Sequence, residues 1–151
     1  MQLSFAASAI SPRYSWPMTN ASAKDLIAAA ATVLNPHVLG DRRSGTVACV
    51  LVTTAGNSHS GVCIDVPCSM GFCAEHAAIA AMVTAGEFRI AKIVAVARDD
   101  KGALWVLSPC GRCREFMYQV HPDNLDAEVV LGPGTSATLR ELLPYNQRSL
   151  A

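Results

Sequence analysis

The sequence predicts an α/β fold, and more closely a three-layer α/β/α domain with a mixed sheet. The first observation is the order of the segments, in which helical patterns alternate with strand-like patterns between residues 22 and 143. The second is the run IAKIVAVA at residues 90–97, which is almost wholly apolar and indicates a central strand covered on both faces. The third is the short connection between the strand-like segments 46–54 and 58–64, which favours an antiparallel pair.

Length and charge limit the classes of function. The 151 residues suffice for one domain with a substantial core, and 51% of them are hydrophobic. Twelve basic residues balance twelve acidic ones, so the chain lacks the positive surplus that favours nucleic acid or an anionic membrane surface. We therefore expect a small, weakly charged substrate, and neither nucleic acid nor a membrane as a partner.

Six cysteines are compatible with disulfides or with thiol chemistry. The first ten residues are mildly apolar, but they lack a basic segment and are too short to span a membrane. We therefore expect a cytoplasmic protein with reduced thiols, three of them on a metal.

Composition sets the expected domain boundaries. Residues 1–20 contain Pro12 and Pro17 and show no clear period, so they are expected to form a loosely held N-terminal extension. Residues 21–144 contain the periodic segments and form the predicted domain. Residues 145–151 form a tail without a strong signal.

Capping and breaking residues set the ends of the predicted elements. Ser22 with Asp25 three residues later is a helix N-cap pattern, and Pro36 ends that helix. Gly86 stops the second helix, and Pro109 suits the start of the third. The expected elements are helices over 22–34, 73–85, 110–120 and 138–143, and strands over 46–54, 58–64, 90–97, 104–107 and 127–131.

Two short motifs hold the residues expected to do chemistry. The motif CAE at residues 73–75 opens one predicted helix, and the motif PCGRC at residues 109–113 opens the next. Three thiolates suit Zn²⁺ and leave its fourth tetrahedral position to water. Glu75, which is not itself a ligand, can take a proton from that water and pass it to a leaving group. The pattern predicts a catalytic zinc site with the ligands Cys73, Cys110 and Cys113.

The zinc motif has competing interpretations. A Cys-x-x-Cys pair by itself is commonly redox-active or structural, and separate cysteines are often inert core packing. A purely structural zinc site has no need of Glu75, so this residue favours catalysis.

The expected metal site carries a charge that needs compensation. Zn²⁺ with three thiolates has a net charge of about minus one, which opposes lowering the pKa of a bound water. Two helix N-termini would contribute positive charge, and Arg112, Arg114 and His76 are candidates to donate hydrogen bonds to the sulfurs.

Other residues near the motifs have more than one interpretation. Cys49 lies inside a predicted strand, where a small core residue is the commoner role. Cys63 and Cys68 flank the loop that leads to Cys73, and each either lines the pocket or is buried; a fourth ligand from Cys68 would close the metal to water. Asp65 in the same loop either meets a substrate hydroxyl or amine or is solvated.

The two motifs resemble those of the cytidine deaminase family, in particular its small homotetrameric branch with three-cysteine zinc sites, which includes blasticidin-S deaminase. The matching segments are CAE at 73–75, LSPCGRCR at 107–114 and RELLP at 140–144, within a likeness over about 21–144. The resemblance implies a mixed, five-stranded sheet between helices. It also implies a homotetramer, or a dimer, whose active sites are shared between subunits.

The resemblance further implies a role for each matching residue. The three cysteines would bind zinc, and Glu75 would shuttle protons while ammonia leaves. The backbone amide of Ala74 would hold the carbonyl of the substrate ring. The backbone carbonyl of Ser108 would accept from its amino group.

The chain departs from the family where the rest of the substrate is bound. Typical members bind ribose through a Phe-x-Val-Gly-Ala strand start and an Asn-x-Glu pair, and the corresponding places here are residues 45–49 and 63–65. The candidate substrate-binding residues at these places are Cys49, Cys63 and Asp65. Arginine usually follows the glutamate, and here His76 does, which leaves Arg112 to neutralise the thiolates.

The leading hypothesis is zinc-dependent hydrolytic deamination of a free cytosine nucleoside or nucleoside analogue, with release of ammonia. Cytidine and a modified, blasticidin-like nucleoside are competing substrates, and the altered segments favour the second slightly. The alternatives are a non-catalytic zinc-binding module that binds nucleosides, and a deaminase of another aminated heterocycle such as a purine base. Editing of nucleic acid is disfavoured by the net charge of zero.

Overall fold

The computed structural model describes residues 20–146, so nearly all of the predicted N-terminal extension and most of the predicted tail lie outside the described residues. Its elements are α1 (Ala23–Val33), β1 (His37–Leu39), β2 (Arg42–Thr53), β3 (Ser58–Asp65), α2 (Ala74–Thr84), β4 (Ile90–Arg98), β5 (Leu104–Leu107), α3 (Gly111–Val120), η1 (Pro122–Asp126), β6 (Glu128–Gly132), β7 (Thr135–Thr138) and α4 (Leu139–Leu142). None of the helices within 20–146 is long and apolar enough to cross a membrane.

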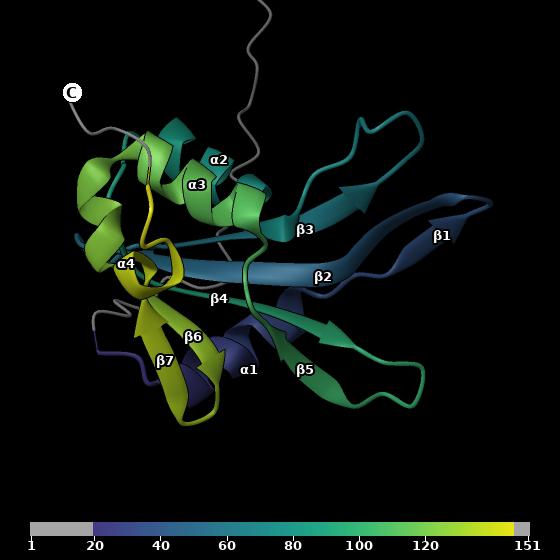
Figure 1. Ribbon diagram of the computed structural model, residues 1–151. Helices are drawn as coiled ribbons and strands as arrows, with labels where there is room; N and C mark the ends of the chain where they lie inside the picture. Colours follow the sequence, from purple (N-terminus) through teal and green to yellow (C-terminus); the bar gives the residue numbers. More distant parts are fainter. Residues whose placement is uncertain (1–19, 147–151) are drawn as a thin grey trace, which may run out of the picture.

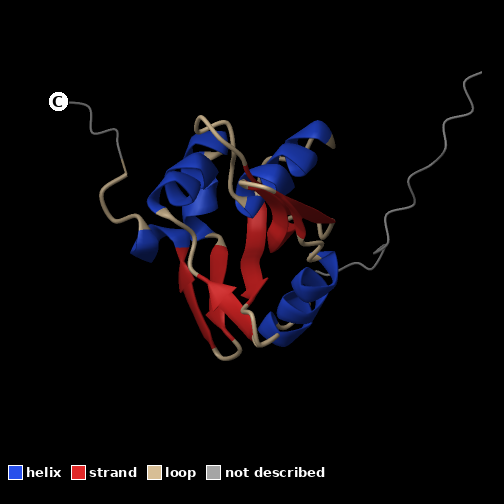
Figure 2. Ribbon diagram, turned by 90° about the vertical axis from the view of Figure 1, so that its right-hand side faces the viewer, coloured by secondary structure: helices blue, strands red, loops and turns tan. Residues whose placement is uncertain are grey.

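A mixed sheet forms the middle layer, with α1 on one face and α2, α3 and α4 toward the other (Figure 1; Figure 2). The predicted three-layer α/β/α class is therefore confirmed. Successive side chains of a strand point to opposite faces of the sheet, so β2 packs against a helical layer on each face. Ala48, Val50 and Val52 pack in the cluster with α1. The alternate residues Cys49 and Leu51 pack in the cluster with α2 and α3.

Within residues 20–146 the sheet contains seven strands, and its continuous order is β3-β2-β4-β6-β7. The short strands β1 and β5 lie beside the ends of β2 and β4, at residues 42–44 and 95–98. The five expected strands correspond to β2, β3, β4, β5 and β6, and the described sheet has two more, β1 and β7. Among the pairs in the described part of the chain, β4 with β6 is parallel and the others are antiparallel.

Two strands were not predicted from the sequence. All three residues of β1 are exposed, and so are three of the four residues of β7. Neither strand therefore shows the alternation of buried and exposed positions that marks a strand in sequence. β2 also begins at Arg42, four residues before the predicted start, because its first part pairs with β1 and a register shift separates Ser44 from Ala48.

Helix α2 lies very close to β3. A Cβ atom built on Gly61 would lie 2.4 Å from the backbone nitrogen of Ala78, so only glycine fits at this position of the strand. This contact sets the distance of α2 from the sheet, and α2 carries Glu75 in its first turn.

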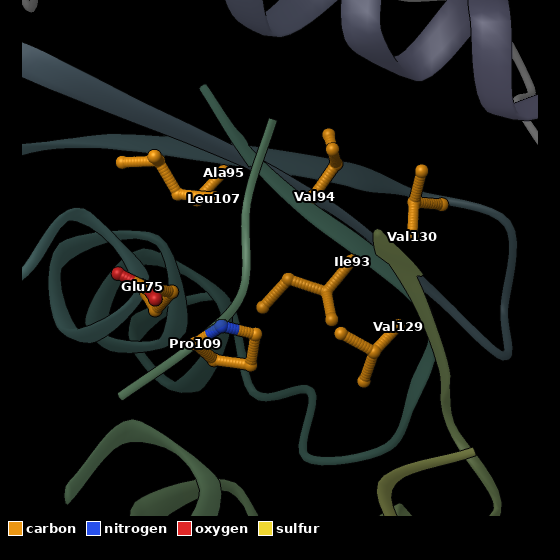
Figure 3. A pocket seen from close by; sticks show the side chains of 8 residues that line it. All are labelled: Glu75, Ile93, Val94, Ala95, Leu107, Pro109, Val129 and Val130. Atoms are coloured by element: carbon orange, nitrogen blue, oxygen red, sulfur yellow. The ribbon is translucent and has the colours of Figure 1, made fainter. Parts of the chain in front are cut away.

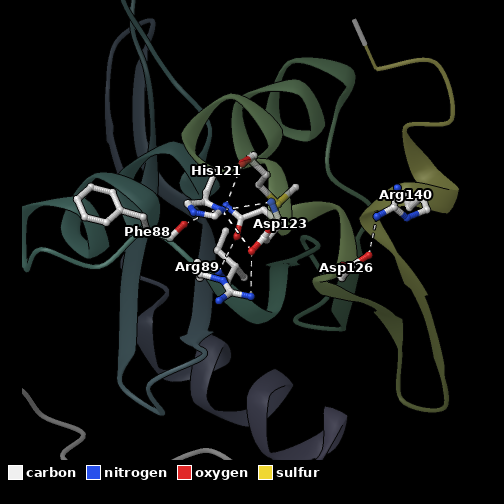
Figure 4. Close-up of polar contacts among 9 residues, drawn as sticks. Phe88, Arg89, His121, Asp123, Asp126 and Arg140 are labelled. Atoms are coloured by element: carbon white, nitrogen blue, oxygen red, sulfur yellow. Dashed lines mark hydrogen bonds and ion pairs between the residues drawn. The ribbon is translucent and has the colours of Figure 1, made fainter. Parts of the chain in front are cut away.

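The short helix η1 connects α3 to the start of β4 through one buried side chain. Asn124 is fully buried, and its Oδ1 accepts a hydrogen bond from the Ile90 amide at 2.7 Å. Its Nδ2 donates to the carbonyl oxygens of Met117 at 2.9 Å and Phe88 at 3.1 Å. Ion pairs at the surface here include Arg89 with Asp123 at 3.1 Å and Arg140 with Asp126 at 2.8 Å (Figure 4).

Candidate active site

Three cysteine thiols meet at the N-termini of two helices. Cys73 is the N-cap of α2 and Cys110 is the N-cap of α3, so each predicted helix begins one residue later than expected. Cys113 lies in the first turn of α3 and is buried. The sulfur of Cys110 lies 3.9 Å from that of Cys73 and 3.4 Å from that of Cys113, and all three sulfurs lie within 4.8 Å of one another.

The geometry of the three sulfurs fits a zinc ion. A Zn–S bond of about 2.3 Å in a tetrahedral site separates neighbouring sulfurs by about 3.8 Å, close to the distances between these thiols. Within residues 20–146, the metal-binding side chains whose ligand atoms all lie within 4.8 Å of one another are Cys73, Cys110 and Cys113. Such a site leaves one coordination position for water or substrate.

The thiols respond to their surroundings in different ways. Burial, and then the charge of Glu75, raises the pKa of Cys113; burial is also the first cause of the raised pKa of Cys73. Burial raises the pKa of Cys110 as well, but hydrogen bonds outweigh this effect and the pKa is lowered overall. The larger bonds come from the amide and the thiol of Cys113, and smaller ones come from Cys73 and the Arg112 amide. The N-terminus of α3 therefore stabilises a thiolate, as expected for a ligand at a helix start.

The carboxyl group of Glu75 lies close to the thiols. Glu75 is only 6% exposed, and its charge contributes to the raised pKa of Cys73, Cys113 and Cys49. It also lines a cavity of about 10 Å³ beside Pro109 and the strands β4, β5 and β6 (Figure 3). That volume holds about one water molecule and is too small for a pyrimidine ring.

His76 contacts the cluster from the same helix turn as Glu75. Its Nδ1 lies 3.5 Å from the sulfur of Cys113, and its ring stacks on Phe116 with 4.4 Å between ring centroids and 11° between planes. Burial first, and then the charge of Arg112, lowers the pKa of His76, which favours the neutral imidazole. A neutral ring that carries its proton on Nδ1 can donate to the thiolate.

Neither arginine side chain in the second motif is hydrogen-bonded to a sulfur. The side-chain polar contacts of the three sulfurs within the described residues are with one another and with His76. Arg112 is exposed, and Arg114 instead donates to Ser108, Pro109 and Leu142.

The candidate substrate-binding residues lie in different surroundings. Cys49 is fully buried in the core below α2, and Asp65 is exposed at the end of β3. The sulfur of Cys63 is used within the sheet, where it accepts from the Val47 amide at 3.3 Å and contacts Thr46 Oγ1 at 3.2 Å.

Two residues at the helix starts keep backbone groups near the cluster. Ala74 is the first residue of α2, where amides have no intrahelical acceptor, and Ser108 lies two residues before Cys110. The loop before Cys73 is closed by paired hydrogen bonds between Ile64 and Phe72 at 3.0 and 2.8 Å. Cys68 in that loop is exposed and is not part of the sulfur cluster.

Two contacts of the site were not predicted from the sequence. The stacking of Phe116 on His76 has a weak signal, because Phe116 lies one helical turn after Cys113 and so on the same face. The bond from Arg114 to Leu142 has none, because 28 residues separate the two positions.

Comparison with known proteins identifies the family. A family model described as the cytidine and deoxycytidylate deaminase zinc-binding region matches residues 21–128. The fold is similar to that of cytidine deaminase from Burkholderia pseudomallei, with 25% identity, a TM-score of 0.65 and coverage of 82% of this chain and 98% of that one. Cytidine deaminase from Mycobacterium leprae shows 26% identity, a TM-score of 0.58 and coverage of 82% and 94%.

A third solved structure agrees with these two. Cytidine deaminase from Mycobacterium tuberculosis is 25% identical, with a TM-score of 0.61 and coverage of 88% of this chain and 97% of that one. The matched family segment includes both cysteine motifs. Because that segment spans well over half of the sequence, the chain belongs to the cytidine and deoxycytidylate deaminase family of zinc-binding hydrolases.

Proposed function

We propose that the protein deaminates a free cytosine nucleoside, or an analogue of one, by zinc-dependent hydrolysis that releases ammonia. The observation that carries this proposal is the buried carboxyl group of Glu75 beside three clustered thiols. A structural zinc site closes all four positions with protein ligands and has no use for such a group.

The residues of the chain divide the reaction between them. Zinc, when bound to Cys73, Cys110 and Cys113, supplies a Lewis acid that lowers the pKa of a coordinated water. Glu75 takes a proton from the attacking water and delivers it to the ring nitrogen. It then takes the proton of the hydroxyl group that has been added to the ring and delivers it to the amine, which leaves as ammonia while the C=O bond forms. The Ala74 amide holds the ring carbonyl, and the Ser108 carbonyl orients the amino group. The water adds to the amine-bearing carbon, the C–N bond breaks, and ammonia leaves.

Charge compensation is assigned to His76 and to the helix starts, in place of an arginine. His76 Nδ1 is 3.5 Å from Cys113, a distance compatible with a hydrogen bond to sulfur. Phe116 restricts the ring of His76 by stacking. Backbone amides at the start of α3 lower the pKa of Cys110 in the same sense. The charge of Arg112 acts on His76, whose pKa it lowers, and would add positive charge beside the cluster.

The substrate is proposed to be a free nucleoside. A net charge of zero gives no general attraction to a polyanion, which disfavours nucleic acid. The place of the ribose is altered, because Cys63 bonds to β2 and Asp65 is exposed, and this favours a modified nucleoside over plain cytidine. A purine base remains the alternative substrate class.

The site is proposed to be completed in a homotetramer, or a dimer, with active sites shared between subunits. The cavity of about 10 Å³ beside Glu75 is too small for a substrate ring, so it does not by itself form the substrate pocket, and a partner subunit would supply part of that pocket. A cytoplasmic location fits the six free thiols, which a reducing compartment would preserve.

An ammonia-release screen tests the proposal. Zinc-loaded protein is assayed with cytidine, deoxycytidine, blasticidin S, cytosine, adenosine and guanine, and the Glu75→Gln variant serves as the blank. We expect release from a cytosine nucleoside and a loss of at least a hundredfold in Glu75→Gln, because general acid–base catalysis contributes about 10²–10⁴-fold. Tight nucleoside binding without ammonia release would instead support the non-catalytic module, and full activity in Glu75→Gln would refute the mechanism.

A further inference from the structure

The guanidinium group of Arg114 connects two segments that are far apart in the sequence. Its Nε donates to the carbonyl oxygen of Pro109 at 2.8 Å, and its Nη2 donates to Ser108 Oγ at 3.1 Å. Its Nη1 donates to the carbonyl oxygen of Leu142 at 3.0 Å. Two of these bonds hold the loop that leads into Cys110, and the third holds the last residue of α4.

All three acceptors of Arg114 are uncharged. The ion pairs found within residues 20–146 do not include this arginine, and its residue is only partly exposed. A guanidinium group offers five donors in a fixed planar arrangement, which suits several acceptors at set angles better than lysine does. The arrangement is that of a brace between backbone segments and not of a surface ion pair.

The segment at the other end of this brace is itself well anchored. Leu139 is fully buried, and it packs in the cluster that contains α2 and α3. Thr138 and Glu141 form a capping box, in which the Thr138 amide donates to Glu141 Oε2 at 2.7 Å and the Glu141 amide donates to Thr138 Oγ1 at 3.3 Å. Helix α4 is therefore fixed at its start by the cap and at its end by Arg114.

We propose that Arg114 is a positioning residue, which holds the loop of residues 108–110 in place by bonding it to α4. Pro109 lines the cavity beside Glu75, and Cys110 belongs to the thiol cluster, so movement of this loop shifts one wall of the site and one metal-binding sulfur together. The C-terminal turn of the domain thereby supports the active site. The expected change in rate rests on the proposed deaminase function, whereas the expected change in loop order does not.

Arginine variants test the brace directly. Arg114→Met keeps an apolar stem and removes all donors, and Arg114→Lys keeps one charged donor group. Arg140→Met removes a surface arginine of α4 as a matched control. Hydrogen exchange of residues 108–113 and 139–143 is measured on zinc-loaded protein, and kcat and KM are measured per bound zinc. The midpoint of thermal unfolding shows which variants are folded.

The brace predicts a specific set of outcomes. Arg114→Met should speed exchange at least tenfold in both segments and lower kcat at least tenfold per bound zinc, because a misplacement of about 1 Å costs about 10²-fold in rate. Arg114→Lys should fall between Arg114→Met and wild type, and Arg140→Met should stay within twofold of wild type. Unchanged exchange in Arg114→Met would overturn the proposal whatever the activity. The proposal would also be overturned if Arg114→Met only reduced the amount of folded protein, while the folded fraction kept the kcat, KM and exchange rates of wild type.

A perturbation from the α4 side tests the coupling. Thr138→Ala removes the cap of α4. It should speed exchange of the Ser108 and Cys110 amides in wild type but add nothing in the Arg114→Met background. Additive effects in the double variant would contradict transmission through Arg114. If Arg114→Met does not fold, the same comparison in the Arg114→Lys background should show a reduced effect of Thr138→Ala, and an undiminished effect would overturn the proposal. If wild type deaminates no nucleoside, the proposed function fails while the exchange measurements still decide the role of Arg114.

Discussion

Asn124 offers a quantitative test of how α3 is held on the sheet. In Asn124→Leu, the buried Ile90 amide loses its acceptor, which costs about 1–3 kcal/mol. The two bonds from Nδ2 to Phe88 and Met117 are also lost, at about 1 kcal/mol each, although Met117 keeps a contact with the His121 amide at 3.4 Å. The apolar leucine recovers about 1 kcal/mol through burial. The free energy of unfolding should therefore fall by about 2–4 kcal/mol.

Urea unfolding measures this change. The protein is kept zinc-saturated and at one concentration, because ligand and subunit binding both shift apparent stability. The transition midpoint should fall while the slope stays constant. Asn35→Ala, at an exposed position, is the control and should stay within about 0.5 kcal/mol of wild type. A loss below about 1 kcal/mol in Asn124→Leu with an unchanged slope would refute the reasoning.

Three further predictions concern the support of the site and its metal. Hydrogen bonds from Thr53 first, and then Asn57, lower the pKa of Glu87. The contribution of the Glu87 carboxylate to the free energy of unfolding is therefore present above the ordinary carboxyl pKa of about 4.3, and it is lost as the pH falls below that value. Urea melts should show Glu87→Gln about 1–2 kcal/mol less stable than wild type at pH 6 and equal to it at low pH; a constant difference would contradict this. Gly61→Ala should lower the unfolding free energy by about 1–3 kcal/mol, since its Cβ meets the Ala78 nitrogen of α2, and an unchanged thermal midpoint would contradict that contact. Chelation should remove one zinc per chain, abolish ammonia release and lower the thermal midpoint, and re-added zinc should restore all three; activity that survives full metal removal would exclude the proposed site.

The metal cluster and the α/β class were open to prediction because both depend on local patterns. A helix start after each strand places Cys73 and Cys110 at N-caps, and a Cys-x-x-Cys spacing then puts Cys113 on the same side of α3. The apolar run of β4 similarly indicates a central strand, and this prediction needs no knowledge of the other elements.

The remaining features depend on contacts that no local pattern carries. β1 and β7 are edge strands with exposed side chains, so tertiary pairing alone makes them strands. Cys63 is directed into the sheet by the amide of Val47, which belongs to another strand. The contact of Arg114 with Leu142 requires α4 to be placed first.

The packing of three thiols within 4.8 Å has a consequence for the protein without its metal. Oxidation of two neighbouring thiols, such as Cys110 and Cys113, passes two electrons to an oxidant, releases two protons and joins the sulfurs in a disulfide. A sulfur in a disulfide no longer binds zinc as a thiolate. The metal therefore also protects its own ligands, and protein that meets air before zinc needs a reductant before it can be loaded.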